Sequence, residues 1–131
     1  MNRIIKKVAV LGSGVMGSRI ACHFANIGVQ VMLLDIVPMQ LTDDEKKNPT
    51  LRNKLVNDSL QAAIKQNPSP VYAQKVIKQI TTGNFDDDLQ KIKDVDWIVE
   101  VVIENLEIKQ QLFEKVDALR KPGTLVTSNT S

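Results

Sequence analysis

The sequence predicts an α/β fold, built as a doubly wound parallel sheet with helices on both faces. Three observations indicate this class. Short apolar segments alternate with amphipathic ones along the 131 residues. The first apolar segment runs directly into a glycine-rich turn, G-S-G-V-M-G at 12–17, and the second ends on the acid Asp35. Strands that alternate with helical segments pair in parallel, and their crossover helices cover the sheet.

The first three elements form a strand, a helix and a strand. Residues 7–11 are expected to be the first strand, and 14–27 the first helix, which ends at Gly28. Strand two, 29–34, is apolar except at Gln30, which suits a strand covered on both faces. One face of the helix carries the residues expected to be buried: Ile20, Ala21, Phe24, Ala25 and Ile27.

A polar stretch follows strand two and predicts a helical insertion. T-D-D-E at 42–45 resembles a helix start, and Asn48-Pro49 interrupts that helix. Helical spacing of apolar residues then runs from Leu51 to about Gln66, and 71–79 is expected to form another helix. Composition leaves open whether this insertion is a substrate-contacting arm or an elaborated connection.

The remaining chain supplies three more strands. Residues 80–82 predict strand three, closed by a turn at Gly83-Asn84, and 85–92 a helical turn. Strand four is expected at 97–102, a helix at 107–119, and strand five at 124–128. Right-handed crossovers then give the strand order 3-2-1-4-5, which is a Rossmann-type sheet.

The glycine turn predicts a dinucleotide site. Gly12 permits a tight turn, Gly14 lets the backbone approach a pyrophosphate, and Gly17 lets the helix pack on the strand. Asp35 follows Gly17 by 18 residues, close to the roughly 20 typical of a ribose-binding acid. No Arg stands at 36–39, which favours NAD over NADP, although Lys46 and Lys47 could fold back. The alternative is a strand-to-helix turn without a ligand.

Ligands of such sheets bind where the strand order reverses, at the carboxyl ends of the strands. Four segments are expected to converge there: 12–17, Asp35, 102–104 and 128–131. Glu104 follows an apolar strand, so its carboxylate is expected at this crevice. Capping the next helix together with Asn105 is the alternative role for Glu104.

Composition excludes several other classes. The 17 basic and 15 acidic residues are scattered and nearly cancel, so no nucleic-acid partner is expected. The single cysteine, Cys22, reads as a packed thiol in a reducing compartment. His23 is expected on a solvated helix face, without a catalytic role. The sequence shows neither a signal peptide nor a membrane-spanning segment, so a cytoplasmic protein is expected.

Three motifs carry a family resemblance: V-A-V-L-G-S-G-V-M-G, D-W-I-V-E-V-V-I-E-N-L-E-I-K and S-N-T-S. Together they resemble the NAD-binding domain of 3-hydroxyacyl-CoA dehydrogenases, enzymes of fatty acid β-oxidation. L-L-D-I-V-P after strand two is most similar to the bacterial multifunctional type. The resemblance implies an NAD-dependent oxidoreductase that converts (S)-3-hydroxyacyl-CoA to 3-oxoacyl-CoA.

The resemblance also implies site residues. Asp35 matches the acid that binds the adenosine ribose, and Glu104 and Lys109 match a pair near the cofactor. Ser131 matches a serine that orients the nicotinamide and the substrate hydroxyl, and Ser59 matches a CoA-contacting serine. Pyrophosphate contact falls on the glycine turn: Gly12, Ser13, Gly14, Val15, Met16 and Gly17.

The family's catalytic histidine and its orienting glutamate lie beyond Ser131. Residues 1–131 are therefore expected to be an incomplete NAD-binding domain of a longer enzyme, without its helical substrate and dimerisation domain and inactive alone. Strand five would then be an open edge, and self-association into a homo-oligomer is expected. The alternatives are another NAD-dependent 3-hydroxyacid dehydrogenase, a non-catalytic NAD(H)-sensing module and a methyltransferase.

Overall fold

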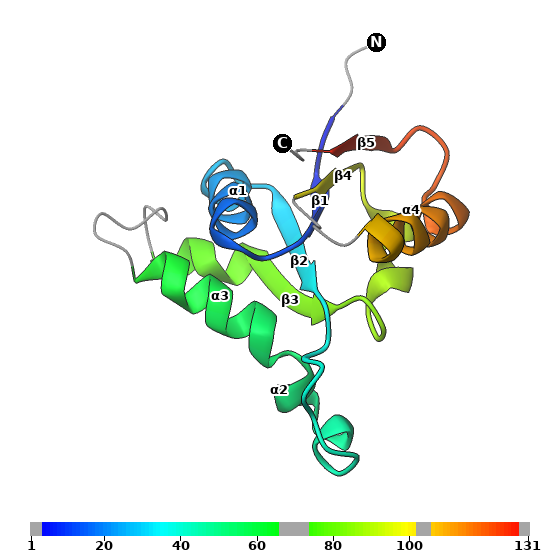
Figure 1. Ribbon diagram of the computed structural model, residues 1–131. Helices are drawn as coiled ribbons and strands as arrows, with labels where there is room; N and C mark the ends of the chain where they lie inside the picture. The colour runs from blue at the N-terminus through cyan, green and yellow to red at the C-terminus, as the bar shows by residue number, and fades with distance from the viewer. Residues whose placement is uncertain (1–3, 66–73, 102–105, 129–131) are drawn as a thin grey trace.

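The centre of the structure is a parallel sheet of five strands in the order β3-β2-β1-β4-β5 (Figure 1). This computed structural model describes residues 4–65, 74–101 and 106–128. The predicted strand order and parallel pairing are confirmed. The strands are β1 (Lys7–Leu11), β2 (Gln30–Asp35), β3 (Ile80–Asn84), β4 (Trp97–Glu100) and β5 (Leu125–Ser128).

Helices cover both faces of this sheet, as the alternating pattern predicts. One face packs against α1 and α3, and the other against η3 and α4 (Figure 1). The helical segments are α1 (Val15–Asn26), η1 (Glu45–Lys47), α2 (Pro49–Arg52), α3 (Lys54–Ile64), η2 (Gln74–Gln79), η3 (Leu89–Asp94) and α4 (Leu106–Leu119). No helix among the described residues is long and apolar enough to cross a membrane.

β1 shows why the strands are apolar throughout. Successive side chains of a strand point to opposite faces. Val8 and Val10 therefore join the core beneath α1 and α3, while Ala9 and Leu11 join the core beneath η3 and α4. Both faces are buried, so no position of the strand after Lys7 is polar.

Two predicted features of the first helix and of strand three differ in the structure. Ile27 is 63% exposed, because α1 ends at Asn26 and Ile27 is its C-terminal cap. β3 continues through Gly83 and Asn84, where the sequence predicts a turn, because these residues pair with Leu34 and Asp35 of β2. Ala21 and Ala25 are buried as predicted, and Ile20 and Phe24 are partly buried against the same core. The fully buried residues of α1 are all small, which lets the helix lie close to the sheet: Gly17, Ser18, Ala21, Cys22 and Ala25.

Other boundaries shift by a few residues. The predicted helix at 71–79 is a short 3-10 helix at Gln74–Gln79, and residues 71–73 lie outside the described part. The helical turn predicted at 85–92 is confirmed: residues 85–88 form a turn, and the 3-10 helix η3 follows from Leu89 to Asp94. Its start is fixed by the Phe85 N–H, which still bonds to the Asp35 carbonyl, 3.0 Å away. Tertiary bonds of this kind displace the ends of elements that local propensity sets.

The helical insertion begins as the T-D-D-E motif predicts. The Thr42 N–H donates to Glu45 Oε1 at 2.9 Å, and the Glu45 N–H donates to Thr42 Oγ at 3.2 Å. This reciprocal pair is a capping box. Hydrogen bonds from Thr42 lower the pKa of Glu45. Asn48 then caps α2 through the Thr50 N–H at 3.0 Å, with Pro49 as its first residue, so Asn48-Pro49 starts a second helix as well as ending the first.

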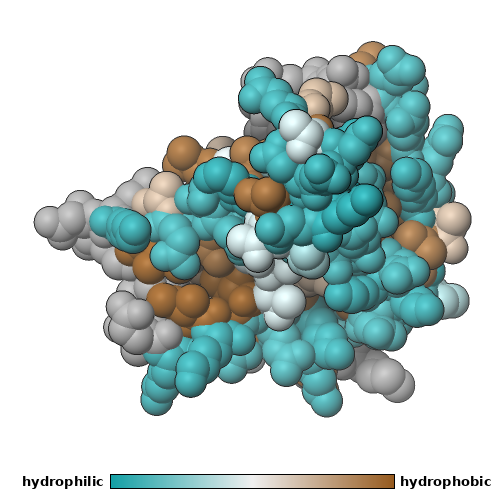
Figure 2. Space-filling model, turned by 90° about the horizontal axis from the view of Figure 1, so that it is seen from below, coloured by the Kyte–Doolittle hydropathy of each residue, from teal (hydrophilic) through white to brown (hydrophobic). Residues whose placement is uncertain are grey.

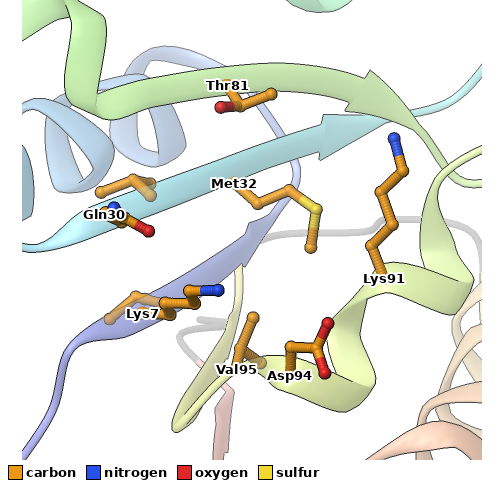
Figure 3. A pocket seen from close by; sticks show the side chains of 9 residues that line it. Lys7, Gln30, Met32, Thr81, Lys91, Asp94 and Val95 are labelled. Atoms are coloured by element: carbon orange, nitrogen blue, oxygen red, sulfur yellow. The ribbon is translucent and has the colours of Figure 1, made fainter.

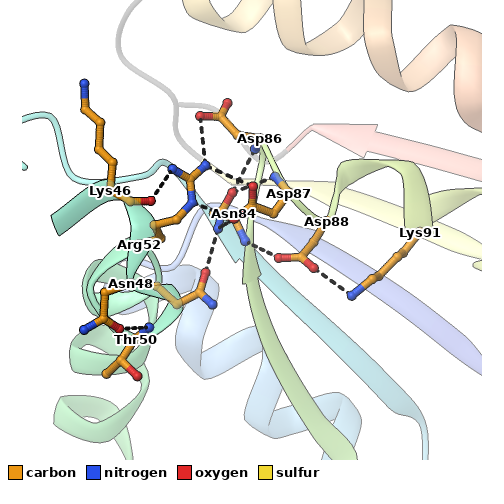
Figure 4. A network of polar contacts seen from close by, with 10 residues as sticks. Lys46, Asn48, Thr50, Arg52, Asn84, Asp86, Asp87, Asp88 and Lys91 are labelled. Atoms are coloured by element: carbon orange, nitrogen blue, oxygen red, sulfur yellow. Dashed lines mark hydrogen bonds and ion pairs between the residues drawn. The ribbon is translucent and has the colours of Figure 1, made fainter. Parts of the chain in front are cut away.

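A polar network joins the insertion to the end of β3 (Figure 4). The Asn84 side chain is buried; its amide donates to Asn53 at 2.8 Å and to Asp87 at 2.9 Å. Arg52 donates two hydrogen bonds to the Asp87 carboxylate, at 2.8 and 2.9 Å. Hydrogen bonds from Arg52 and then Asn84 lower the pKa of Asp87. Since η1 and α2 contain no buried residue, this network is what holds them to the sheet.

Asp96 plays a similar part at the amino end of β4. Its carboxylate accepts hydrogen bonds from the Lys6 and Lys7 N–H groups, at 2.9 and 3.1 Å, and from the Lys121 ammonium at 2.9 Å. The bond from Lys121, followed by that from Lys6, lowers the pKa of Asp96 from 3.8 to about 2. Asp96 thus ties the chain ahead of β1 to the loop that leads into β5.

The lowered pKa of Asp96 predicts a pH-dependent stability. Because the folded pKa lies below the unfolded one, the stabilisation is complete above about pH 4 and disappears as the pH falls through about 2. Asp96→Asn should lower the free energy of unfolding by about 2 kcal/mol at pH 6 and by only about 0.4 kcal/mol at pH 2, where half of the folded molecules still carry the charged carboxylate. Urea denaturation at both pH values measures this difference.

Asp58→Asn is the control for this experiment. Asp58 pairs with Lys54 on the exposed surface of α3, and such pairs contribute about 0–1 kcal/mol. An Asp96→Asn effect of the same size at pH 2 and pH 6 would contradict the electrostatic explanation.

Candidate functional site

The glycine turn after β1 has a shape that two of its glycines impose. Gly12 has a φ of +111°, and a Cβ there would lie 2.4 Å from the Val101 carbonyl oxygen. A Cβ on Gly17 would lie 1.8 Å from the carbonyl oxygen of Gly12. Neither position has room for a side chain. Gly12 makes the tight turn and Gly17 allows the close approach of α1, as predicted for each of them.

Gly14 differs from these two. A Cβ on Gly14 would have no atom within 4 Å, and its φ is −56°, so protein packing does not require glycine there. Gly14 is also the N-cap of α1 and offers no side chain to the amide groups of the first turn. The amino end of the helix is therefore open towards the space that the predicted pyrophosphate would fill.

Asp35 faces the mouth of the turn. Its Oδ2 accepts hydrogen bonds from the Ser13 N–H at 2.8 Å and from the Ser13 hydroxyl at 2.5 Å. Its Oδ1 accepts the Ile36 N–H at 2.7 Å. Ser13 is buried, so its side chain holds Asp35 in place from within the turn. The two features on which the dinucleotide prediction depends are thus in direct contact.

A pocket of about 230 Å³ separates the turn from the insertion. It is lined by Ser13, Gly14 and Val15 on one side and by Ser59, Ala62 and Ala63 of α3 on the other. The structure thereby brings Ser59 beside the glycine turn.

Val15 and Met16 are exposed at the start of α1, at 69% and 48%. Figure 2 shows that hydrophobic residues gather in one hollowed area on the face seen from below.

A second pocket of about 200 Å³ begins immediately after Asp35. Ile36 and Val37 line one wall, and Gln111, Leu112 and Lys115 of α4 line the other. Its position between the carboxyl end of β2 and α4 suits a flat apolar group attached to the ribose that Asp35 would bind. The adenine of a dinucleotide has this character.

Glu100, at the carboxyl end of β4, is a buried charged residue that the sequence analysis did not single out. It ends β4, is 0% exposed, and accepts the Ser128 hydroxyl at 2.5 Å. The Lys109 ammonium lies 3.8 Å from its other carboxylate oxygen and 5.9 Å from the centre of the Phe113 ring. A signal was present, since Glu100 is the one charged residue in the apolar run at 97–103. Glu104 and Ser131 lie outside the described residues.

Two residues lie away from this site. Cys22 is buried in the α1 core, as predicted, and burial raises the pKa of its thiol. His23 is exposed on the outer side of α1, as predicted, where its ring meets the edge of Phe24. Among the described residues, no group of His, Cys, Asp and Glu could hold a metal ion.

A third pocket, of about 270 Å³, lies at the opposite end of the strands (Figure 3). Lys7 and Gln30, which line it, are the first residues of β1 and β2. It is therefore remote from the carboxyl ends, where parallel sheets of this kind bind ligands.

The residues at the carboxyl ends fit a dinucleotide. Gly14 leaves the amino end of α1 open, Asp35 is fixed at the adjacent position, and the pocket beyond it has both apolar and polar lining residues. The family model of the 3-hydroxyacyl-CoA dehydrogenase NAD binding domain matches residues 7–131. The chain belongs to this family. Its cofactor is accordingly NAD, and the predicted family resemblance is confirmed.

Similar proteins carry names that agree with this family assignment. A Bacillus subtilis protein named "Probable 3-hydroxyacyl-CoA dehydrogenase" is 50% identical over 100% of this chain and 17% of its own length. A candidate fatty acid oxidation complex trifunctional enzyme of Rickettsia felis is 41% identical, again over 100% of this chain and 17% of its own length. The chain therefore spans about a sixth of these curated relatives.

A solved structure shows the same fold. The 3-hydroxybutyryl-CoA dehydrogenase of Escherichia coli K12 is 29% identical, with a TM-score of 0.65. The similarity covers 98% of this chain and 25% of that one. This chain is thus similar to a solved dehydrogenase in both sequence and fold.

Proposed function

We propose that the chain is the NAD-binding part of an enzyme that oxidises (S)-3-hydroxyacyl-CoA to 3-oxoacyl-CoA in fatty acid β-oxidation. The family match over 7–131 gives the reaction class. The observation that carries the assignment of the site is the contact between Asp35 and Ser13, which joins the ribose-binding acid to the glycine turn.

In this proposal the backbone of the turn binds the pyrophosphate: Gly12, Ser13, Gly14, Val15, Met16 and Gly17. Asp35 accepts hydrogen bonds from the adenosine ribose, and Lys109 presents its ammonium near the cofactor. Glu104 and Ser131 are proposed to contact the cofactor on the strength of the family motifs, with Ser131 also orienting the substrate. When bound, the nicotinamide accepts the hydride of the 3-hydroxyl carbon.

The preference for NAD over NADP follows from charge. Asp35 would repel a 2′-phosphate, and Arg52, a nearby cation, is engaged elsewhere. Arg52 bonds to Asp87, and it also donates to the Lys46 carbonyl at 3.1 Å, which anchors the backbone of η1 (Figure 4). The engagement of Arg52 supports the predicted preference for NAD.

Removal of the hydroxyl proton needs a positioned base. We propose that His23, which is exposed on the outer side of α1, does not supply this base. We propose that the base and the helical substrate domain belong to the part of the longer relatives that this chain does not span. The chain alone should then bind NAD without catalysing turnover.

Three further features of the proposal concern the surroundings of the site. Ser59, which lines the pocket opposite Gly14, is proposed to contact the CoA part of the substrate. β5 lies at the edge of the sheet with Leu125 exposed, which supports self-association into a homo-oligomer. A cytoplasmic location is proposed from the single buried thiol and the bacterial relatives.

Titration of the chain with NADH, NADPH and S-adenosylmethionine tests the assignment. NADH should bind most tightly. Asp35→Asn should weaken the binding of NADH at least tenfold, because a hydrogen bond to a charged acceptor contributes about 1.5–3 kcal/mol. The same variant should weaken the binding of NADPH much less, since it also removes the repulsion of the 2′-phosphate.

Asp58→Asn, on the exposed surface of α3, is the control and should leave NADH affinity unchanged. Binding of S-adenosylmethionine alone would reject the dehydrogenase assignment in favour of a methyltransferase.

A further inference from the structure

Glu100 is a charged side chain in an unusual place. It is the last residue of β4, in the interior of the sheet, and is fully buried. β4 is otherwise apolar over its buried positions, Ile98 and Val99. Burial of a carboxylate is costly unless partners compensate, and well-packed apolar residues often replace such groups without loss of stability. Packing alone therefore gives no reason for a carboxylate at this position.

The partners of Glu100 come from two other elements. Ser128, at the end of β5, donates its hydroxyl to Oε2 at 2.5 Å. Lys109, in the first turn of α4, places its ammonium 3.8 Å from Oε1, with a side chain that is 20% exposed. One carboxylate thus connects the carboxyl ends of β4 and β5 with the amino end of α4.

This junction lies against the glycine turn. Glu100 pairs in register with Leu11, the residue before Gly12. The next residue, Val101, donates its N–H to the Leu11 carbonyl at 2.9 Å, and its own carbonyl occupies the space beside Gly12. The strand order reverses between β1 and β4, so the Lys109 ammonium is held at the point where such sheets bind their ligands.

We propose that Glu100 is a positioning residue for cofactor binding, which fixes the Lys109 ammonium near the glycine turn and holds the end of β5 against β4. This inference rests on the proposed function. A lysine carries its charge on a flexible four-carbon stem, so an unrestrained ammonium would have to be ordered when an anionic ligand binds. The buried carboxylate orders it beforehand, which reduces the cost of binding.

Isothermal titration with NADH tests the role. Glu100→Gln keeps the shape of the side chain and an oxygen for the Ser128 hydroxyl, but it removes the charge that faces Lys109. We expect NADH to bind about tenfold more weakly, and about tenfold more weakly to Lys109→Gln. In the double variant, Glu100→Gln should cause little further loss, because its effect acts through Lys109.

Asp96→Asn is the matched control. Asp96 is also a carboxylate paired with a lysine beside β4, but at the opposite end of the strand. This control should lose stability in urea while its NADH affinity stays within about twofold, because no contact joins it to the glycine turn. If Glu100→Gln lost stability only and kept its NADH affinity, Glu100 would be a structural residue and the proposal would be overturned.

Two further outcomes are decisive. Losses in the two single variants that multiply in the double variant would show that Glu100 does not act through Lys109, and would also overturn the proposal. If Glu100→Gln does not fold, Ser128→Ala replaces it, because this change removes only the exposed hydroxyl that donates to Glu100. An unchanged NADH affinity in that variant would count against the role of Glu100 at β5. Failure of the unaltered chain to bind NADH would instead reject the proposed function.

Discussion

Gly17→Ala is expected to destabilise the protein by about 3 kcal/mol or more, the upper range for overpacking of a core. The added Cβ would lie 1.8 Å from the carbonyl oxygen of Gly12 and 2.8 Å from its carbonyl carbon. Both are backbone atoms of the tight turn, so no side chain can rotate to make room. α1 would have to move away from β1, which would open the core formed by Val10, Ala21 and Ala25. Urea denaturation measures the loss.

Gly28→Ala is the matched control for this prediction, because Gly28 flanks the other end of α1. Gly28 has a φ of +86°, and a Cβ there would have no atom within 4 Å. Only backbone strain should result, about 1 kcal/mol. Equal losses in the two variants would mean that α1 can shift without cost and that close packing at Gly17 does not limit the fold.

The strand order could be predicted because few topologies satisfy the pattern of this sequence. Each apolar segment is followed by a helical one, so the crossovers are right-handed. The first three strands then extend the sheet to one side of β1, and the last two extend it to the other side. The glycine turn then identifies β1 without ambiguity. Ile27 shows the limit of periodicity, because the end of α1 at Asn26, and not the apolar character of Ile27, decides its exposure.

The end of β3 and the insertion were harder to predict because long-range polar contacts determine them. Asn84 has the composition of a turn residue, but its side chain bonds Asn53 and its backbone pairs with Asp35. These partners lie 31 and 49 positions away in the sequence. No local rule connects them, so the sequence predicts a turn where the structure has a strand.

The position of Asp35 beside the glycine turn could be predicted from the sequence, but the contacts between them could not. The spacing from Gly17 to Asp35 places an acid at the correct edge of the sheet, and the structure has it there. Ser13 holds this acid with both its N–H and its hydroxyl. These two contacts depend on the directions of the Ser13 N–H and hydroxyl, which the sequence does not give. Glu100 is different, since a charge within an apolar strand is visible in the sequence and indicates a buried partner.

Gly14→Ala is expected to weaken NADH binding by about 30- to 100-fold, which corresponds to about 2–3 kcal/mol for a methyl group forced into a filled contact. The free protein has space for this methyl group, since no atom lies within 4 Å and the φ of −56° suits alanine. The free energy of unfolding should therefore change by less than about 0.5 kcal/mol. NADH titration and urea denaturation of the same preparation measure the two effects.

The variants at Gly14 and Gly17 then distinguish the two reasons for glycine in this turn, which are cofactor binding and close packing. At Gly17 the protein's own backbone fills the space, so substitution should remove stability and binding together. At Gly14 the space is open, so substitution should remove binding alone, because only the cofactor needs the backbone to be bare there. A Gly14→Ala variant that binds NADH normally would place the pyrophosphate elsewhere. It would leave the fold as argued but refute the assignment of this turn as the cofactor site.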